Sequence, residues 1–383
     1  MAGRDAAAEI LTQLARGPGP ASSPDVVLAF VSCRLDPRRV LDGMWSLLPP
    51  ATRLIGCSSM AEVGPDGGVT GSVSAAAICF SGVEWDIFSV QCPSEPESSA
   101  AGRALAERML PFDPSLVLLF SDGPRINNPH LLRGMREILG EHRRIAGGVA
   151  SDMLEFAHTF ELLDRDVLHG SAVALAMRGT VRSALAAKAG FQPVGHTRTV
   201  TRVEDERLIL ELDGVSALTL YKELLGSDVV QRPRIGAEFP LAVMAGGDGD
   251  PHSAEDRPYV LRVVRELDEE RGALVCGGDI RPGAKVRLTR AVREDLLRAA
   301  AEATAEATAE LPDPALALVF TCAGRKRILG WRYQEELDLC FAELAAHVPR
   351  IGFYTFGEIL PTARDISMFH AETFALALVG GAR

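Results

Sequence analysis

Residues 351–361 read Ile351-Gly352-Phe353-Tyr354-Thr355-Phe356-Gly357-Glu358-Ile359-Leu360-Pro361, and an altered copy of this stretch occurs far upstream. The copy, residues 55–65, reads Ile55-Gly56-Cys57-Ser58-Ser59-Met60-Ala61-Glu62-Val63-Gly64-Pro65. The isoleucine, glycine, glutamate and proline coincide in register, and Ser59 takes the place of Thr355. Because the sequence on both sides of each copy also repeats, we infer that the chain contains related structural units.

Three units share one order of elements: a buried strand, a helix, a glycine-led strand, a loop and a closing strand that ends in glycine. The first strands are continuous apolar runs, which are typical of strands buried on both faces. We expect these strands at residues 26–31, 116–120 and 316–320, and the helices that follow them at residues 37–48, 128–141 and 333–347. Since one helix connects the first strand to the glycine-led strand, the two strands should be parallel.

Between the second and third units the pattern changes. A hairpin is expected over residues 197–212, followed by a helix at 215–225, a loop at 246–251, strands at 259–264 and 273–276, and a helix at 292–310. Residues 1–14 are expected to form one or two helical turns, and the Gly/Pro/Ser-rich residues 17–24 to break regular structure.

We therefore predict an α/β protein of two domains, with mixed β-sheets covered by helices and built from repeated β-α-β-β units. The expected division is a leader and linker at residues 1–24, an N-terminal domain at 25–195 and a C-terminal domain at 196–383. A chain of 383 residues is longer than one hydrophobic core usually serves, which agrees with two domains.

The composition favours a cytoplasmic protein. A net charge of −11 and few aromatic residues (6%) argue against nucleic-acid binding. The chain lacks a secretory signal and any apolar run of the ~18 residues that a membrane helix needs, so no membrane insertion is expected. Seven cysteines, an odd number without a CxxC pair, indicate a reducing compartment.

Ligands of parallel sheets usually bind beyond the carboxyl ends of the strands. In the third unit this rule brings together a set of polar side chains, with Thr373 beside them. The expected ligand-binding residues are Cys322, Arg325, Tyr354, Thr355, Glu358 and His370, and their counterparts in the first two units are Ser59, Glu62, Asp122 and Asp152.

This set suits a small zwitterionic or carboxylate ligand, such as an amino acid. Arg325 would hold a carboxylate, and Glu358 would accept a hydrogen bond from an amine. The alternative is structural: Glu358 would satisfy backbone N–H groups, Arg325 would be solvated, and the glycines would only permit tight packing.

Cys322 offers a second alternative, a cysteine-dependent enzyme. The cations Arg325, Lys326 and Arg327 follow it closely and could lower its pKa, and His370 could act as a base. However, Asp122 occupies the same position in the second unit, and free cysteines are commonly buried in cores. No phosphate-binding loop, nucleotide fingerprint or metal-ligand spacing occurs, so no cofactor, metal or catalytic residue is predicted.

The residues of these stretches resemble the FIST (F-box and intracellular signal transduction) sensory proteins. The resemblance lies in residues 55–63, in Gly147 to Asp152, and above all in Cys322-Ala323-Gly324-Arg325 followed by residues 352–359. It covers nearly everything from about residue 25 onward. Two departures are Ala61, where glycine is usual before the glutamate, and Ala371, where asparagine often follows the histidine.

The resemblance implies a non-catalytic sensory role in signal transduction, with a small amino-acid-like ligand and a separate signalling protein as partner. A ligand-independent interaction scaffold remains the third alternative. A ligand that raises the melting temperature would separate the sensor from the scaffold.

Overall fold

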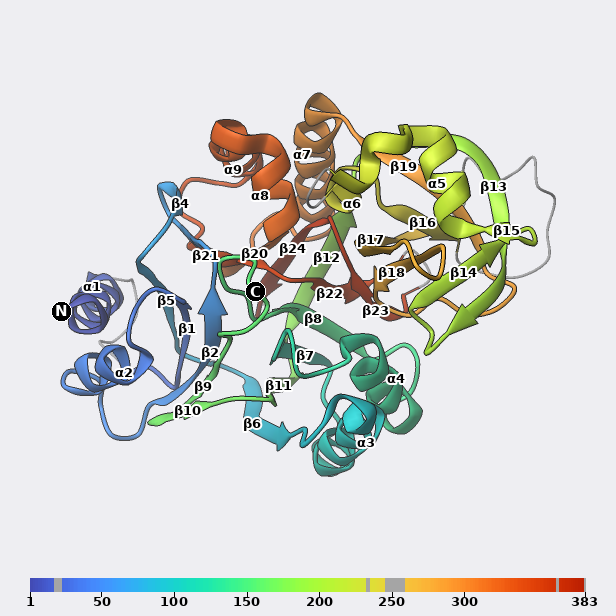
Figure 1. Ribbon diagram of the computed structural model, residues 1–383. Helices are drawn as coiled ribbons and strands as arrows, with labels where there is room; N and C mark the ends of the chain where they lie inside the picture. Colours follow the sequence, from blue (N-terminus) through green and yellow to red (C-terminus); the bar gives the residue numbers. More distant parts are fainter. Residues whose placement is uncertain (17–22, 232–234, 245–258, 363–364, 382–383) are drawn as a thin grey trace.

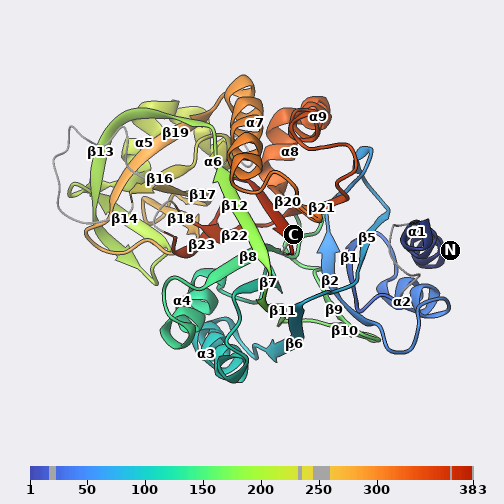
Figure 2. The same ribbon diagram turned by 180° about the vertical axis from the view of Figure 1, so that it is seen from behind.

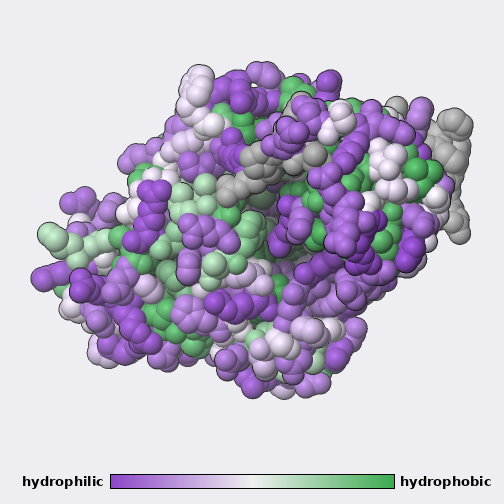
Figure 3. Space-filling model, viewed as in Figure 1, coloured by the Kyte–Doolittle hydropathy of each residue, from purple (hydrophilic) through white to green (hydrophobic). Residues whose placement is uncertain are grey.

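The computed structural model describes residues 1–16, 23–231, 235–244, 259–362 and 365–381. The loop expected at 246–251 and most of the linker expected at 17–24 lie outside these residues. In Figure 1, three groups of helices surround a centre of strands: α1 and α2, α3 and α4, and α7 to α9. The face seen in Figure 3 is largely hydrophilic, with scattered apolar patches.

Each group of helices belongs to one of three units with the same order of elements. The first unit comprises α1 (Ala2–Arg16), β1 (Val26–Ser32), α2 (Pro37–Trp45), β2 (Arg53–Ser59), β3 (Glu62–Gly64), β4 (Gly67–Val69) and β5 (Val73–Ile78). The second comprises α3 (Ser98–Met109), β7 (Leu116–Ser121), α4 (Asn128–Leu139), β8 (Arg144–Val149), β9 (Glu161–Leu163), β10 (Asp166–Leu168) and β11 (Ser171–Gly179). The third comprises α7 (Arg293–Glu310), β20 (Leu316–Cys322), α8 (Ala323–Leu329), α9 (Tyr333–Glu343), β21 (Arg350–Thr355), β22 (Glu358–Pro361), β23 (Ser367–His370) and β24 (Phe374–Gly380).

The pairing of strands within the units confirms the repeat. In every unit the first strand is parallel to the glycine-led strand, as β1 is to β2, β7 to β8 and β20 to β21. The closing strand pairs antiparallel to the other side of the first strand, as β5, β11 and β24 do. The predicted α/β class is confirmed.

Each unit gives its short hairpin to a different unit. The hairpin β3–β4 of the first unit extends the third unit's sheet beside β21. The hairpin β9–β10 of the second unit extends the first sheet beside β2, and β22–β23 of the third unit extends the second sheet beside β8. The exchange forms a closed ring, so no unit has a complete sheet on its own.

An aromatic core lies where the three first strands meet. Phe30, Phe120 and Phe320 occupy the same position in β1, β7 and β20, and none is exposed. The ring centroids of Phe30 lie 5.3 Å from Phe120 and 6.4 Å from Phe320, and those of Phe120 and Phe320 are 6.2 Å apart. Edge-to-face contacts at these distances stabilise aromatic pairs beyond the area they bury.

The glycine that begins each repeated stretch has a steric role. A β-carbon on Gly56, Gly147 or Gly352 would lie 1.7–1.9 Å from a carbonyl oxygen of the adjacent first strand. Every larger residue would therefore push the parallel pair apart.

A separate seven-stranded sheet follows the second unit. It comprises β13 (Phe191–Glu204), β14 (Leu208–Leu212), β15 (Val215–Ser216), β16 (Leu241–Met244), β17 (Tyr259–Asp268), β18 (Ala273–Gly277) and β19 (Lys285–Ala291), with α5 (Ala217–Leu225) and α6 (Ile235–Glu238). The sheet closes on itself because β13 pairs with both β19 and β14. Figures 1 and 2 show β14 and β15 at the opposite end of the molecule from α1 and α2.

Two connecting strands complete the sheets of the units. β6 (Val83–Gln91) pairs with β11, and β12 (Arg182–Lys188) pairs with β24. The boundary expected near residue 195 falls inside β13, and two sheets join strands from both sides of it. Residue 195 is therefore not a border between sheets, and the division into two domains stays a prediction.

The beginning of the chain differs from the expectation of one or two helical turns. α1 has 15 residues, and its Ala7 and Ile10 are buried in the core that includes Val40 and Met44 of α2. The buried residues Gly3, Ala7 and Ile10 of α1 therefore make it the leading helix of the first unit, as α3 and α7 are of the others. Among the described residues, no helix is both long and apolar enough to cross a membrane.

Candidate functional site

The three glycine-led stretches meet one another just beyond the ends of their strands. The amide of Tyr354 donates to the carbonyl of Ala61 at 2.9 Å, and the amide of Phe356 donates to that of Val149 at 3.0 Å. The hydroxyl of Ser151 donates to the carbonyl of Tyr354. The carboxyl ends of the parallel strands therefore converge, as the repeat predicts.

Two of the expected ligand-binding residues, Glu62 and Glu358, occupy equivalent places at the start of an exchanged hairpin. The hydroxyl of Ser59 donates to Oε1 of Glu62 at 2.5 Å, and the hydroxyl of Thr355 donates to Oε1 of Glu358. Oε2 of Glu358 accepts the amide of Thr373 at 3.2 Å. Both carboxyl groups are at most 1% exposed, so they satisfy groups of the protein itself.

A third equivalent glutamate, Glu161, was not predicted. It begins the hairpin of the second unit, and its Oε2 accepts the amide of Ser171 at 3.2 Å. It follows Gly147 by fourteen residues, whereas the other two follow their glycines by six, which hides it from a comparison in register. Ala150 stands where the other units have Ser59 and Thr355, and Oε1 of Glu161 has no hydrogen-bond partner.

Burial raises the pKa of all three glutamates. The pKa values of Glu161 and Glu358 lie well above the usual range, mainly because burial disfavours the charged form. The pKa of Glu62 is also raised by burial, but hydrogen bonds from Ser59 and Ser72 oppose the shift. A neutral, enclosed Glu358 is a poor partner for an ammonium group, so its role in ligand binding stays a prediction.

Arg325 is fully buried and fully hydrogen-bonded. Its Nε and Nη2 donate to Glu336 Oε1 at 2.9 and 2.7 Å, and Glu336 is also unexposed. The remaining donors reach the carbonyls of Ala189, Leu296 and Glu372. This guanidinium ties α8, α9 and α7 together, and no donor is left for a carboxylate ligand.

Asp122 and Asp152 also bind backbone groups near them. Asp122 accepts the amides of Arg125 at 2.8 Å and Gly170 at 3.0 Å. Asp152 accepts four amides, from residues 155–158. Burial alone would raise the pKa of Asp152, but these four N–H groups outweigh it and lower the pKa. Both carboxylates shape the loops that follow their strands.

The thiol of Cys322 and the phenol of Tyr354 are enclosed. Burial first, and then the nearby Glu372 and Glu358, raise the pKa of Cys322 well above its usual value. The thiol is therefore protonated at neutral pH, which disfavours it as a nucleophile. The hydroxyl of Tyr354 is buried without a hydrogen-bond partner, and burial raises its pKa strongly.

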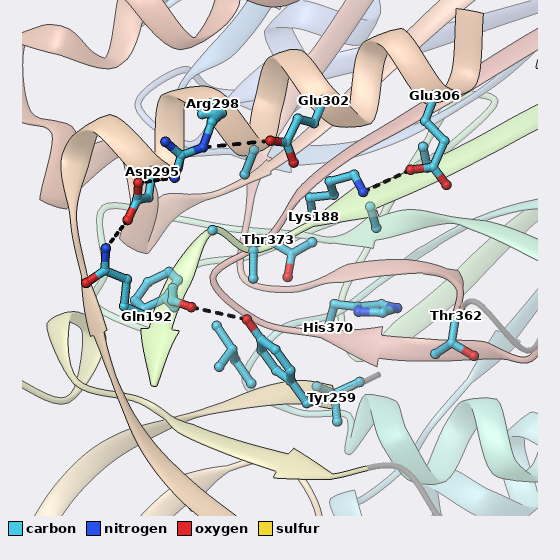
Figure 4. A pocket seen from close by; sticks show the side chains of 18 of the residues that line it. Lys188, Gln192, Tyr259, Asp295, Arg298, Glu302, Glu306, Thr362, His370 and Thr373 are labelled. Carbon is cyan, nitrogen blue, oxygen red and sulfur yellow. Dashed lines mark hydrogen bonds and ion pairs between the residues drawn. The ribbon is translucent and has the colours of Figure 1, made fainter. Parts of the chain in front are cut away.

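The enclosed residues Arg325, Cys322, Tyr354 and Glu358 form what we call the buried cluster. A pocket of about 740 Å³ lies beside it, and we name it the His370 pocket. Residues 185–193 of β12 and β13 border it, together with α7, the first residues of β17, and the hairpin β22–β23 with Thr373. Figure 4 shows Arg298, Glu302 and Glu306 along α7 on one side and Tyr259, Thr362 and His370 on the other. Of the ten expected ligand-binding residues, His370 is the one that lines this pocket.

His370 enters the pocket as a neutral ring. Its Nε2 lies 3.0 Å from the carbonyl of Leu360, so Nε2 carries the proton and donates. Burial lowers the pKa of His370 to about 4. Nδ1 of the neutral ring is then a hydrogen-bond acceptor, which suits a ligand N–H or O–H group.

One ion pair links β12 to α7 at the pocket's rim, and a second lies within α7. Lys188 Nζ lies 3.0 Å from Glu306 Oε2, and Arg298 pairs with Asp295. Glu302 lies farther from a cation, with Oε1 3.7 Å from Nε of Arg298. The rim therefore offers both signs of charge and a surplus of one carboxylate.

One group of side chains in the described part of the chain has the geometry of a metal site. His130, Glu206 and Asp279 converge, with Nε2 of His130 2.9 Å from Glu206 and 3.1 Å from Asp279. However, Arg133 lies 3.5 Å from Glu206. Because the arginine already balances this negative charge, the cluster is better described as an ion-pair network between α4 and the seven-stranded sheet.

Comparison with known protein families gives two adjacent matches. The FIST N domain matches residues 25–215, from just before β1 to β15. The FIST C domain matches residues 217–361, from α5 to β22. No curated protein matches the chain. Together the two matches run from β1 to β22, and α1, β23 and β24 lie outside them.

Proposed function

The chain belongs to the FIST family, whose domains are sensory modules of signal transduction, and we propose that it senses a small ligand in the His370 pocket. The ligand is an amino-acid-like molecule or a carboxylate, and the protein passes the signal to a separate partner in the cytoplasm. It does so without catalysis.

The pocket itself is the observation that carries this proposal. Its volume of about 740 Å³ lies in the range of small-molecule sites, roughly 300–1,000 Å³. His370 and Tyr259 offer hydrogen-bonding groups, and the rim supplies cations and carboxylates for a zwitterion. The other nine residues of the expected site lie outside its lining, and two of them, Arg325 and Glu358, hold the turn that carries His370 and Thr373.

The buried cluster gives the pocket a route to the rest of the fold. The amide of Thr373 donates to Glu358, which begins the hairpin that the third unit gives to the second. A ligand that moves Thr373 would therefore act on the contact between two units.

All seven cysteines are free, which is in keeping with a reducing compartment.

Differential scanning fluorimetry with the twenty amino acids and common di- and tricarboxylates tests the proposal. A compound at about 100 times its Kd should stabilise the protein by about 2.7 kcal/mol. The shift in melting temperature should be lost in His370→Ala and kept in Glu310→Gln, which changes an exposed glutamate of α7 outside the pocket. A flat response to every compound would contradict the proposal and favour a ligand-independent scaffold.

A further inference from the structure

We propose that the ligand of the His370 pocket is a short oligopeptide with a basic side chain, which pairs as an added strand with the free edge of β12. This inference rests on the proposed function and names the chemical class of its ligand. A free amino acid fills only part of the same site.

The position of β12 in its sheet is the first observation. The third unit's sheet has the order β12-β24-β20-β21-β3-β4, so β12 is an edge strand. Its residues 182–188 pair with β24 along one side, and within the described parts of the chain no strand pairs with the other. An edge strand presents unpaired N–H and C=O groups, which can receive an extended peptide.

The lining places the pocket at this edge. The consecutive residues Leu185, Ala186 and Ala187 all border the pocket, although their side chains alternate between the two faces of the sheet. Only a pocket beside the edge of a strand can be bordered by residues of both faces in succession. Ala186 and Ala187 are small, so their side chains add little bulk beside the edge, and Ala187 is partly exposed.

The length of the lining exceeds what one amino acid requires. The nine residues Leu185 to Pro193 border the pocket without interruption. Four of them, Leu185 to Lys188, lie in β12 and span roughly 13 Å at about 3.3 Å per residue, before the chain turns at Gly190 (φ +75°) into β13. Two hydrogen bonds frame the edge: Arg144 donates to the carbonyl of Ser183 at 2.9 Å, and Arg325 donates to that of Ala189. The groove between these points suits several peptide residues.

The charge of the rim determines the kind of peptide. Five charged side chains line the pocket: Lys188, Arg298, Asp295, Glu302 and Glu306. Lys188 pairs with Glu306 and Arg298 with Asp295, which leaves Glu302 with the weakest partner. Glu302 is 54% exposed and can therefore turn to a lysine or arginine of the ligand.

Affinity selection with a tryptic digest of serum albumin tests this inference, because nearly every peptide of that digest ends in lysine or arginine. Peptides that stay with the protein through gel filtration are identified by mass spectrometry, synthesised and titrated by calorimetry. Each peptide is then N-methylated either at its odd-numbered or at its even-numbered residues. One of these two versions should bind about tenfold more weakly or worse, because a strand edge bonds to every second residue. Free lysine and arginine should bind more weakly than the peptides.

Charge reversal on α7 supplies the matched pair of variants. Glu302→Lys should weaken the selected peptides about tenfold, and Glu294→Lys, on the same helix outside the pocket, should leave their affinity unchanged. If amino acids or carboxylates bind but no peptide is retained, the proposed function stands and this inference is wrong. If both N-methylated versions bind as well as the unmodified peptide, pairing with β12 is wrong. If neither peptides nor small molecules bind, the proposed function itself fails.

Discussion

The carboxylate of Glu372 lies in the space that a β-carbon on Gly324 would fill, since its Oε1 is 1.9 Å from that position. Glu372 itself has φ +54°, and the equivalent residues in the turns before the other closing strands are Gly71 and Gly170, also with positive φ. Its Oε2 is buried without a hydrogen-bond partner. The third unit therefore keeps a glutamate at a position where the other two have glycine.

The first prediction concerns Glu372→Gly, which should raise the free energy of unfolding by about 1 kcal/mol. Glycine adopts a positive φ without the steric strain that a side chain adds, and the change also removes a buried oxygen that has no hydrogen-bond partner. Urea denaturation at pH 7 measures the change. A loss of stability in Glu372→Gly would mean that the carboxyl group makes a stabilising contact.

A double-mutant cycle between these two residues is the second prediction. Gly324→Ala should destabilise the protein by about 1–3 kcal/mol, because the added methyl group overpacks against the carboxylate. In the Glu372→Gly background the same change should cost much less. The coupling energy from the four urea curves is the measurement, and a coupling near zero would show that the clash with Glu372 is not what excludes alanine.

The third prediction is a loss of stability with rising pH. The pKa of Glu161 in the folded protein is raised well above its unfolded value of about 4.3. The protonated form is therefore favoured by folding, and this contribution is complete below pH ~4.3 and is lost as pH rises towards the folded pKa. One such group changes the free energy of unfolding by up to about 1.4 kcal/mol per pH unit.

Glu161→Gln isolates this effect. The amide stays neutral, so the variant should be more stable than the natural chain at pH 8. The difference in stability between the two should be smaller at pH 5. Melting temperatures from pH 5 to 9 test the difference, with the exposed Glu310→Gln as control. An unchanged pH profile in Glu161→Gln would contradict a buried, protonated Glu161.

The fourth prediction tests the structural role of Arg325. Arg325→Met leaves Glu336 buried without its partner, and breaking a buried ion pair in this way should cost about 3–5 kcal/mol. The double variant Arg325→Met with Glu336→Gln should recover much of the loss. If Arg325→Met instead leaves the free energy of unfolding unchanged and only lowers the affinity for a ligand of the His370 pocket, the sequence interpretation of Arg325 as a ligand-binding residue is right.

The sequence predicted the repeat because its signal is local. A glycine that touches a neighbouring carbonyl and a glutamate that begins a hairpin must recur wherever the unit recurs, as Gly56, Gly352, Glu62 and Glu358 do. The exchange of hairpins was not predictable, since a short strand such as residues 62–64 carries no mark of which sheet it joins. α8 was missed because it has only seven residues and begins directly after β20.

The convergence of polar side chains beyond the ends of the parallel strands was predicted, but the contacts that these side chains make were not. The rule that polar residues at the ends of parallel strands converge did gather Thr355, Glu358 and Thr373. It could not show that Arg325 is satisfied by Glu336, because the residues are eleven apart and meet only after α8 and α9 fold together. The pocket was also hidden, since β12 and α7 meet beside His370 only in three dimensions.

The last prediction separates the sensor from the cysteine-dependent enzyme. Cys79 is exposed, whereas Cys322 is 5% exposed and burial raises its pKa well above the usual value. Iodoacetamide at pH 7.5 should therefore modify Cys79 first in the native protein, and Cys322 only when urea unfolds it. Burial and neighbouring acids raise the pKa of the half-buried Cys33 to about 11, so it should react slowly. Mass spectrometry of timed digests follows each site. Rapid native labelling of Cys322 would require an accessible thiolate and would revive the catalytic alternative, because a nucleophile must be ionised and reachable.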